Sequence, residues 1–321
     1  MPSEPLALGI DIGGTRVRAG LVDAQGVLRA RAETATDARG GPAAVVAQIV
    51  KLADEVAASV ERGDLVGAGV SAPGPLDTVR GVALGVPTLR GWVDVPIAAL
   101  LAEALGLAVR LENDGIAAAN GEWRFGAGRG LSSLVYVTVS TGVGGGVVAD
   151  GRLLRGRFGM AGHVGHMTVV RDGTLCSCGS RGCWEAYASG TAFAVRAGRE
   201  PRAVFAAAMA GDAAALAQVA EEADWLGLGI ANLCHLYSPE RVILGGGVAK
   251  GFALLEPGIR ARLLRNAMPA FRDVGVTAAA LGENAGLVGA AALLFEGKGW
   301  SWGGCTDPSP PVGPSPRRGE E

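Results

Sequence analysis

The chain has 321 residues, of which 49% are hydrophobic, so it is long enough for two domains of ordinary size with substantial buried cores. Its 29 Lys and Arg residues nearly balance its 31 Asp and Glu residues, which gives no electrostatic case for binding nucleic acid or an anionic membrane. The N-terminus lacks a basic stretch followed by an apolar one, and no segment reaches the run of about 18 apolar residues that a membrane span needs, so we expect a cytoplasmic protein whose partner is a small molecule.

Two segments share one pattern of strand, glycine-rich turn, strand, short turn and strand. The first runs from residue 6 to about 30 and the second from 133 to 156. Two such modules predict a duplicated α/β core, with a small N-terminal domain at 1–115 and a larger C-terminal domain at 116–296.

The remaining segments alternate between helical and strand-like apolar spacing. We expect helices at 42–58, 96–105, 190–236, 254–264 and 286–295. We expect strands at 65–73, 107–113, 241–244 and near Val276. This alternation predicts α/β layering. Residues 297–321 are rich in Pro, Gly and Ser without apolar periodicity, which predicts a disordered tail.

The first glycine turn carries the sequence Asp11-Ile12-Gly13-Gly14-Thr15. Glycines let backbone amides approach a phosphate group, and the Thr15 hydroxyl can donate to it. Asp11 could orient the hydration shell of a Mg²⁺ ion. The alternative is an ordinary hairpin with a glycine turn.

Two further glycine turns predict contacts with a nucleotide. The stretch 140–146 contains Thr141 and Gly142 and reads as a second phosphate-binding turn, while Gly246 and Gly247 belong to a third that could lie against a ribose or base. Neither has the Lys-Ser or Lys-Thr of a Walker motif, and neither opens a helix, which disfavours P-loop and Rossmann enzymes.

Asn113 and Asp114 follow a predicted strand and precede a predicted helix, so their side chains should emerge at the carboxyl end of a sheet. A carboxylate there can accept the proton of a hydroxyl group as it attacks a phosphate, and Asn113 can hold sugar hydroxyls. The alternative makes Asp114 a helix N-cap and Asn113 a turn former.

His166, Cys176, Cys178 and Cys183 provide one imidazole and three thiolates. This set completes a tetrahedral zinc site without an open position, which is typical of structural zinc. The alternative is a loop with free thiols. A metal there would rigidify the loop and fix Glu185 toward the same crevice.

Five motifs in this order resemble the ROK family: DIGGT, END, STGVGGG, GMAGHVGH and CSCGSRGCWE, at 11–15, 112–114, 140–146, 159–166 and 176–185. The resemblance covers nearly all of residues 6–295. It implies the two-domain actin-like ATPase fold (ribonuclease H-like), in which sugar and nucleotide bind in the cleft between the domains.

The resemblance also implies the roles of individual residues in an ATP-dependent sugar kinase. Asp114 would be the catalytic base. The sugar would contact Asn113, His166 and Glu185, with Gly74 lining the same side. The ATP phosphates would lie near Asp11, Gly14, Thr15 and Thr141. It further implies a homodimer or homotetramer.

One position departs from the family pattern. The usual sugar-contacting Glu of G-E-x-G-H is His163 here, a form that resembles some bacterial N-acetylmannosamine kinases. An imidazole could suit a different sugar substituent, or it could be a tolerated replacement. Because the other motifs resemble glucokinases and broad hexokinases, we expect phosphorylation of the 6-hydroxyl of glucose, with N-acetylmannosamine or another N-acetylhexosamine as the alternative.

Two alternatives involve no catalysis. ROK transcriptional repressors carry an added winged-helix domain before the first motif, whereas ten residues precede Asp11 here, so we do not expect a DNA-binding repressor. A sugar sensor without activity would agree with His163 but would not explain why Asp11, Thr15 and Asp114 occur together.

Overall fold

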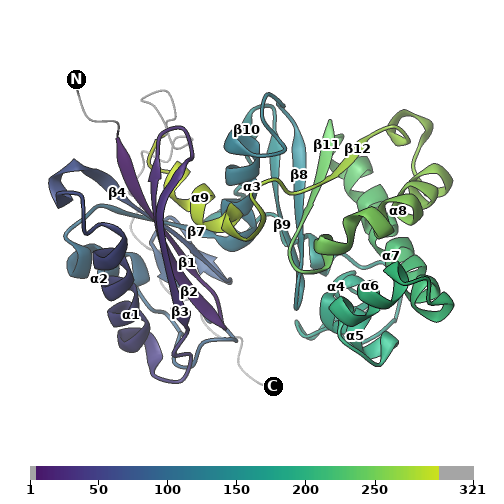
Figure 1. Ribbon diagram of the computed structural model, residues 1–321, viewed down its shortest axis with the longest axis horizontal. Coiled ribbons are helices and arrows are strands. Elements are labelled where there is room, and N and C mark those ends of the chain that lie inside the picture. Colours follow the sequence, from purple (N-terminus) through teal and green to yellow (C-terminus); the bar gives the residue numbers. More distant parts are fainter. Residues whose placement is uncertain (1–4, 296–321) are drawn as a thin grey trace, which may run out of the picture.

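The structure is a computed structural model that describes residues 5–295. Its strands form two five-stranded sheets that lie apart from one another, with helices packed on each (Figure 1). The mixed α/β architecture predicted from the alternating spacing is confirmed. The predicted tail at 297–321 lies outside the described residues.

The first sheet has the strand order β3-β2-β1-β4-β7. Strands β1 (Leu6–Ile12), β2 (Arg16–Asp23) and β3 (Leu28–Ala35) form the predicted antiparallel meander. Strands β4 (Leu65–Ala72) and β7 (Val109–Asn113) run parallel to β1, so the carboxyl ends of these three strands meet at one edge. Helices α1 (Gly41–Val56) and α2 (Ile97–Leu105) share a core with this sheet. A two-stranded ribbon, β5 (Leu76–Asp77) with β6 (Val82–Ala83), lies between β4 and α2 in the chain.

The second sheet repeats this plan with the order β10-β9-β8-β11-β12. Strands β8 (Leu134–Val139), β9 (Val143–Ala149) and β10 (Arg152–Leu153) form its antiparallel meander. Strands β11 (Arg241–Gly245) and β12 (Gly275–Ala278) are parallel to β8. The duplication predicted from the two glycine-turn modules is therefore present in the topology.

The helices of the second sheet cover one face of it with a large apolar core. They are α4 (Glu185–Ala188), α5 (Gly190–Ala197), α6 (Pro201–Met209), α7 (Ala213–Tyr237) and α8 (Phe252–Asn266). The stretch 190–236, expected to be mostly helical, consists of the three helices α5, α6 and α7. Gly198 ends α5 in the left-handed conformation, and Gly211, also at positive φ, separates α6 from α7, because glycine adopts such dihedrals without steric cost.

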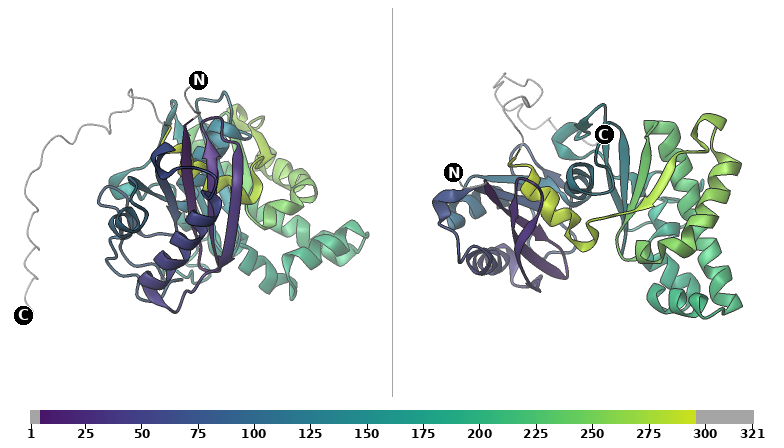
Figure 2. Two further views of the ribbon diagram at one scale, coloured as in Figure 1. Left: turned by 60° about the vertical axis from the view of Figure 1, so that its left-hand side comes forward. Right: turned by 45° about the horizontal axis from the view of Figure 1, so that its top comes forward.

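Helices α3 (Asp114–Phe125) and α9 (Ala285–Ala292) pack against each other between the two sheets (Figure 2). Their contact is close because small residues face each other: a side chain on Gly289 would place its Cβ only 1.7 Å from the Ala117 carbonyl oxygen. Helix α3 also packs on β8 and β9, whereas α9 packs on β1 and β4. The boundary between residues 115 and 116 stays a prediction. Within residues 5–295, no helix has the length and apolar character required to cross a bilayer.

Candidate functional site

Asp11 lies near the end of β1, and both of its carboxylate oxygens are engaged. Ser71 Oγ on the neighbouring β4 donates to Oδ1 at 2.9 Å, and Arg18 Nη1 on β2 donates to Oδ2 at 2.9 Å. Both contacts follow from strand register, since Asp11 is paired with Arg18 in β2 and with Ser71 in β4. The sequence analysis missed Arg18 and Ser71, although the hairpin register around the glycine turn would have indicated the first.

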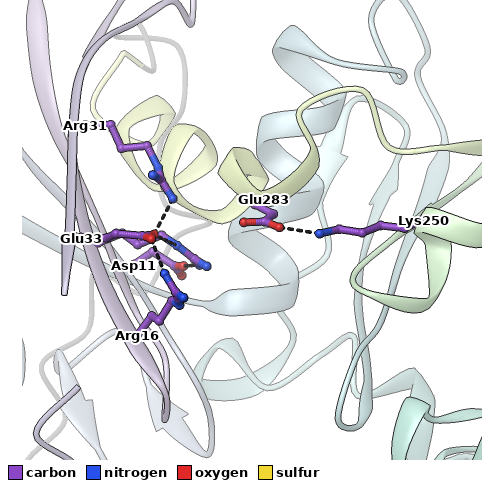
Figure 3. Close-up of polar contacts among 7 residues, drawn as sticks. Asp11, Arg16, Arg31, Glu33, Lys250 and Glu283 are labelled. Carbon is purple, nitrogen blue, oxygen red and sulfur yellow. Dashed lines mark hydrogen bonds and ion pairs between the residues drawn. The ribbon is translucent and has the colours of Figure 1, made fainter. Parts of the chain in front are cut away.

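A group of arginines surrounds Asp11 (Figure 3). Arg16, Arg18 and Arg31 all pair with the carboxylate of Glu33 on β3. Three cations thus face two carboxylates, which leaves this surface with one excess positive charge, suited to an anion.

A second ion pair in the same view approaches these arginines (Figure 3). Lys250 Nζ lies 2.6 Å from Glu283 Oε1, and this bond and the lysine charge hold the pKa of Glu283 below its usual range. Arg18 and Arg31 lower that pKa further. Lys250 follows the third glycine turn, so the charged surface next to Asp11 lies near that turn.

The first glycine turn is held tightly by its neighbours. The Gly13 amide donates to the Arg16 carbonyl at 2.9 Å, and Thr36 Oγ1 donates to the Gly13 carbonyl at 2.7 Å. Gly14 packs against Thr88, whose Cβ would lie 2.9 Å from a Cβ added at position 14. Thr15 is exposed at the start of β2. The turn is thus rigid, and its threonine side chain is accessible to a ligand.

Asn113 and Asp114 lie where β7 ends and α3 begins, as predicted. The N-cap is Asn113, whose Oδ1 accepts from the amides of Gly115 at 3.0 Å and Ile116 at 3.4 Å; the alternative that made Asp114 the cap is wrong. The Asp114 carboxylate remains accessible to solvent, yet the protein atoms around it desolvate it. This burial raises the pKa of Asp114 to about 6, with a further rise from the charge of Asp11.

Gly74, Asn113 and His163 come together from three distant parts of the sequence. A Cβ at Gly74 would lie 3.4 Å from Asn113 Nδ2 and 3.5 Å from His163 Nε2. His163 Nδ1 lies 3.0 Å from the Met160 carbonyl oxygen, which can only accept, so Nδ1 carries a proton. In the neutral ring Nε2 is then an acceptor.

The second glycine turn is shorter than predicted. Only Ser140, Thr141 and Gly142 connect β8 to β9, whereas Gly144–Gly146 lie inside β9. Gly146 is needed because α3 packs directly on the strand: a Cβ there would lie 2.8 Å from the Gly115 carbonyl oxygen. A Cβ at Gly145 would instead lie 2.5 Å from the Tyr136 carbonyl oxygen of β8. These two glycines serve packing rather than the turn.

The third glycine turn lies next to the second. Gly245 of β11 is paired with Thr138 of β8, so the two turns leave neighbouring strand ends. Gly246 has φ +85°, a backbone conformation that favours glycine. A Cβ there would also lie 2.4 Å from the Val139 carbonyl oxygen, so the available space requires glycine as well. No atom lies within 4 Å of the Cβ position of Gly247 among the described residues. This surface is therefore open to a ligand.

The four predicted metal ligands converge. The donor atoms of His166, Cys176, Cys178 and Cys183 all lie within 4.8 Å of one another. The sulfurs of Cys178 and Cys183 are 3.7 Å apart, and Cys176 Sγ is 3.7 Å from His166 Nδ1. Tetrahedral zinc with Zn–S bonds of about 2.3 Å requires S···S separations near 3.8 Å, so the cluster fits zinc. Because His166 turns Nδ1 to this cluster, its Nε2 remains available to a second ligand.

Glu185 is the first residue of α4 and lies beside both the cysteine loop and the second glycine turn. Its Oε1 accepts from Ser177 Oγ at 2.9 Å and its Oε2 accepts from the Val143 amide at 3.0 Å. Ser177 was not among the predicted site residues, because no motif singles out the residue between two cysteines.

Arg155 is another residue that the sequence did not indicate. Its Nε donates to Glu112 Oε2 at 2.7 Å, and Glu112 is 2% exposed. The other oxygen of Glu112 accepts from the Asn113 amide at 3.1 Å. This pair ties the strand that precedes Asp114 to the segment that leads to His163.

Comparison with known proteins places these features in a family. The sequence profile of the ROK family matches residues 7–296. A glucokinase of Streptomyces coelicolor is 36% identical over 321 residues, covering 91% of this chain and 98% of the relative. An N-acetylmannosamine kinase of Citrobacter koseri is 36% identical over 297 residues, covering 90% and 98%.

A solved structure of a ROK family member is also similar to this chain. The ROK family glucokinase from Streptomyces griseus, in complex with glucose and AMPPNP, superposes with a TM-score of 0.80 at 36% identity, covering 90% of this chain and 98% of that one. The expected two-domain actin-like ATPase fold is thereby confirmed.

Proposed function

The chain belongs to the ROK family, and we propose that it transfers a phosphoryl group from ATP to the 6-hydroxyl group of a hexose. The observation that carries this proposal is the position of Asp114. Its carboxylate lies at the junction of β7 and α3, beside Asn113, with Asp11 and His163 near enough to influence its pKa.

In the proposed reaction, Asp114 is the general base. With a pKa of about 6, its carboxylate is mostly ionised at pH 7 but is more basic than an ordinary aspartate. As the sugar oxygen forms its bond to the γ-phosphorus of ATP, the hydroxyl proton passes to Asp114 and the bond to the leaving ADP oxygen breaks. Such proton acceptance contributes about 10² to 10⁴ in rate.

The three glycine turns and Asp11 would hold the nucleotide. Thr15, Thr141 and the amides of Gly13, Gly14 and Gly142 would contact the phosphates, while Gly246 and Gly247 would contact the ribose or base. Each Asp11 oxygen keeps an acceptor position beside its bond to Ser71 or Arg18, so the carboxylate can bind water molecules of a Mg²⁺ ion. The Mg²⁺ would neutralise negative charge on the ATP phosphates.

The sugar would contact Asn113, His163, His166 and Glu185, with Gly74 leaving space beside them. His163 supports glucose as the preferred substrate, because the Met160 carbonyl holds the proton on Nδ1 and Nε2 can then act as an acceptor, the same hydrogen-bonding polarity as the glutamate usual at this position. N-acetylmannosamine is the second candidate, since the N-acetylmannosamine kinase of Citrobacter koseri and the glucokinase of Streptomyces coelicolor are both 36% identical to this chain.

We further propose that the cluster of His166, Cys176, Cys178 and Cys183 binds a structural zinc ion. Four protein ligands leave no open coordination position, so the metal would order the loop and not take part in phosphoryl transfer. Assembly into a homodimer or homotetramer is also proposed, and light scattering of the purified protein tests it.

The deciding experiment is an ADP-release assay with ATP and Mg²⁺ across glucose, mannose, fructose, N-acetylglucosamine and N-acetylmannosamine. Turnover with glucose as the best substrate is expected. A higher kcat/KM for N-acetylmannosamine would assign the second candidate. Sugar binding by calorimetry without turnover on any of the five would replace the kinase with a sugar sensor.

A further inference from the structure

One carboxylate joins the cysteine loop to the second glycine turn. Glu185 accepts from Ser177 Oγ on one oxygen and from the Val143 amide on the other. The carboxylate packs directly on the turn, since a Cβ at Gly142 would lie 2.4 Å from Glu185 Oε2. Its orientation is therefore set from two sides.

Ser177 is held in place by its neighbours in the chain. It lies between Cys176 and Cys178, two of the four residues whose donor atoms converge. Fixing both cysteines on one metal ion fixes the backbone on either side of Ser177, and with it the direction of the Ser177 hydroxyl.

We propose that Ser177 is a positioning residue for Glu185 and that it makes sugar affinity depend on the metal in the cysteine loop. A carboxylate offers about four acceptor positions, of which Ser177 and Val143 take two, so two remain for sugar hydroxyl groups. Cys176 Sγ also lies 3.6 Å from the same Glu185 oxygen, but a thiolate that binds the metal has no proton to donate. With the metal in place, loss of the Ser177 bond therefore leaves Glu185 anchored on one oxygen only, and its orientation relaxes. This inference rests on the proposed roles of Glu185 and of the zinc site.

The test measures glucose binding by titration calorimetry on zinc-loaded protein, with the zinc content of each preparation determined separately. Ser177→Ala is expected to weaken glucose binding about three- to tenfold, the size of one ordinary hydrogen bond, with zinc content unchanged and kcat affected less than KM. Ser177→Thr, which keeps the hydroxyl, should restore the affinity.

Thr174→Ala is the matched control, because this residue lies in the same loop and its hydroxyl makes no hydrogen bond to another described residue. It should bind glucose as the unmodified protein does. If Thr174→Ala weakened binding as much as Ser177→Ala, the effect would belong to the loop in general and the positioning role would be refuted.

Removing the metal tests whether the metal and Ser177 affect glucose affinity through the same hydrogen bond to Glu185. Stripping zinc from the unmodified protein should weaken glucose binding, and stripping it from Ser177→Ala should weaken it by a smaller factor, because the Ser177 bond is already lost and only the effect through His166 remains. Independent, additive losses would overturn the proposal. If stripping unfolds the chain, as seen by circular dichroism, the comparison of Ser177→Ala with Ser177→Thr decides alone.

Glu185→Ala separates this inference from the proposed function. If Glu185→Ala loses glucose binding while Ser177→Ala does not, Glu185 contacts the sugar and the positioning role of Ser177 is wrong. If Glu185→Ala binds glucose normally, the proposed sugar-binding role of Glu185 itself fails.

Discussion

Arg155 and Glu112 form a partly buried ion pair between the segment that leads to His163 and the strand that ends at Asn113, with 2.7 Å between Arg155 Nε and Glu112 Oε2. Removal of Arg155 takes its positive charge away from a carboxylate that is 2% exposed. Arg155→Ala should therefore lower the free energy of unfolding by about 3 kcal/mol, measured by urea denaturation.

Arg152→Ala is the control for this prediction, because Arg152 is an exposed arginine on β10 three positions away. It should change stability by less than about 0.5 kcal/mol. Equal effects of the two substitutions would show that the ion pair contributes nothing beyond a surface charge.

Asp114→Asn should reduce kcat by about 100-fold or more while glucose affinity changes little, because the amide keeps the shape of the side chain but cannot accept the proton. Single-turnover rates and calorimetry measure the two quantities. Asp150→Asn serves as the control, since Asp150 is an exposed turn residue at φ +50°, a conformation that Asn also tolerates. Full turnover in Asp114→Asn would remove Asp114 from the proposed role.

The raised pKa of Asp114 predicts a pH profile. The base must be ionised, and its pKa is about 6, so kcat/KM should fall about tenfold per pH unit below pH 6 and level off above it. The effect on stability has the opposite sign. Because the pKa is higher in the folded chain than in the unfolded one, ionisation of Asp114 opposes folding fully above pH 6; this penalty shrinks as the pH falls below 6 and is gone below the ordinary value of 3.8. A profile that stays flat down to pH 4.5 would contradict the assignment.

Elemental analysis of the dialysed protein should find about one zinc per chain. Cys178→Ser should lose most of that zinc and lower the melting temperature, because three ligands no longer complete the site. Cys234→Ala removes a buried cysteine of α7, far along the chain from this cluster, and should keep the zinc. Retention of zinc in Cys178→Ser would show that the metal is bound elsewhere.

The sequence predicted the parts of this site that depend on local pattern. Glycine turns, the strand-to-helix junction at Asp114 and the spacing of the cysteines are all readable within a few residues. The partners of those groups were not readable, because Arg18 and Ser71 reach Asp11 through strand register and Arg155 reaches Glu112 through tertiary packing. The glycines of β9 were misassigned to the turn for the same reason, since Gly146 is explained by the packing of α3 and Gly145 by the close approach of β8.

His163→Glu tests whether this position selects the sugar. The substitution keeps an acceptor near Gly74 and Asn113, so glucose should remain a substrate with kcat/KM within about fivefold. Because the two side chains share the same hydrogen-bonding polarity, the ratio of N-acetylmannosamine to glucose turnover should also change by less than about fivefold, whereas a tenfold fall would mean that His163 favours N-acetylmannosamine. The charge change has a second effect. His163 lowers the pKa of Asp114, and a carboxylate in its place would raise that pKa, so the acid limb of kcat/KM should move to higher pH. An unchanged substrate ratio together with a shifted limb would mean that His163 influences the base but does not select the sugar.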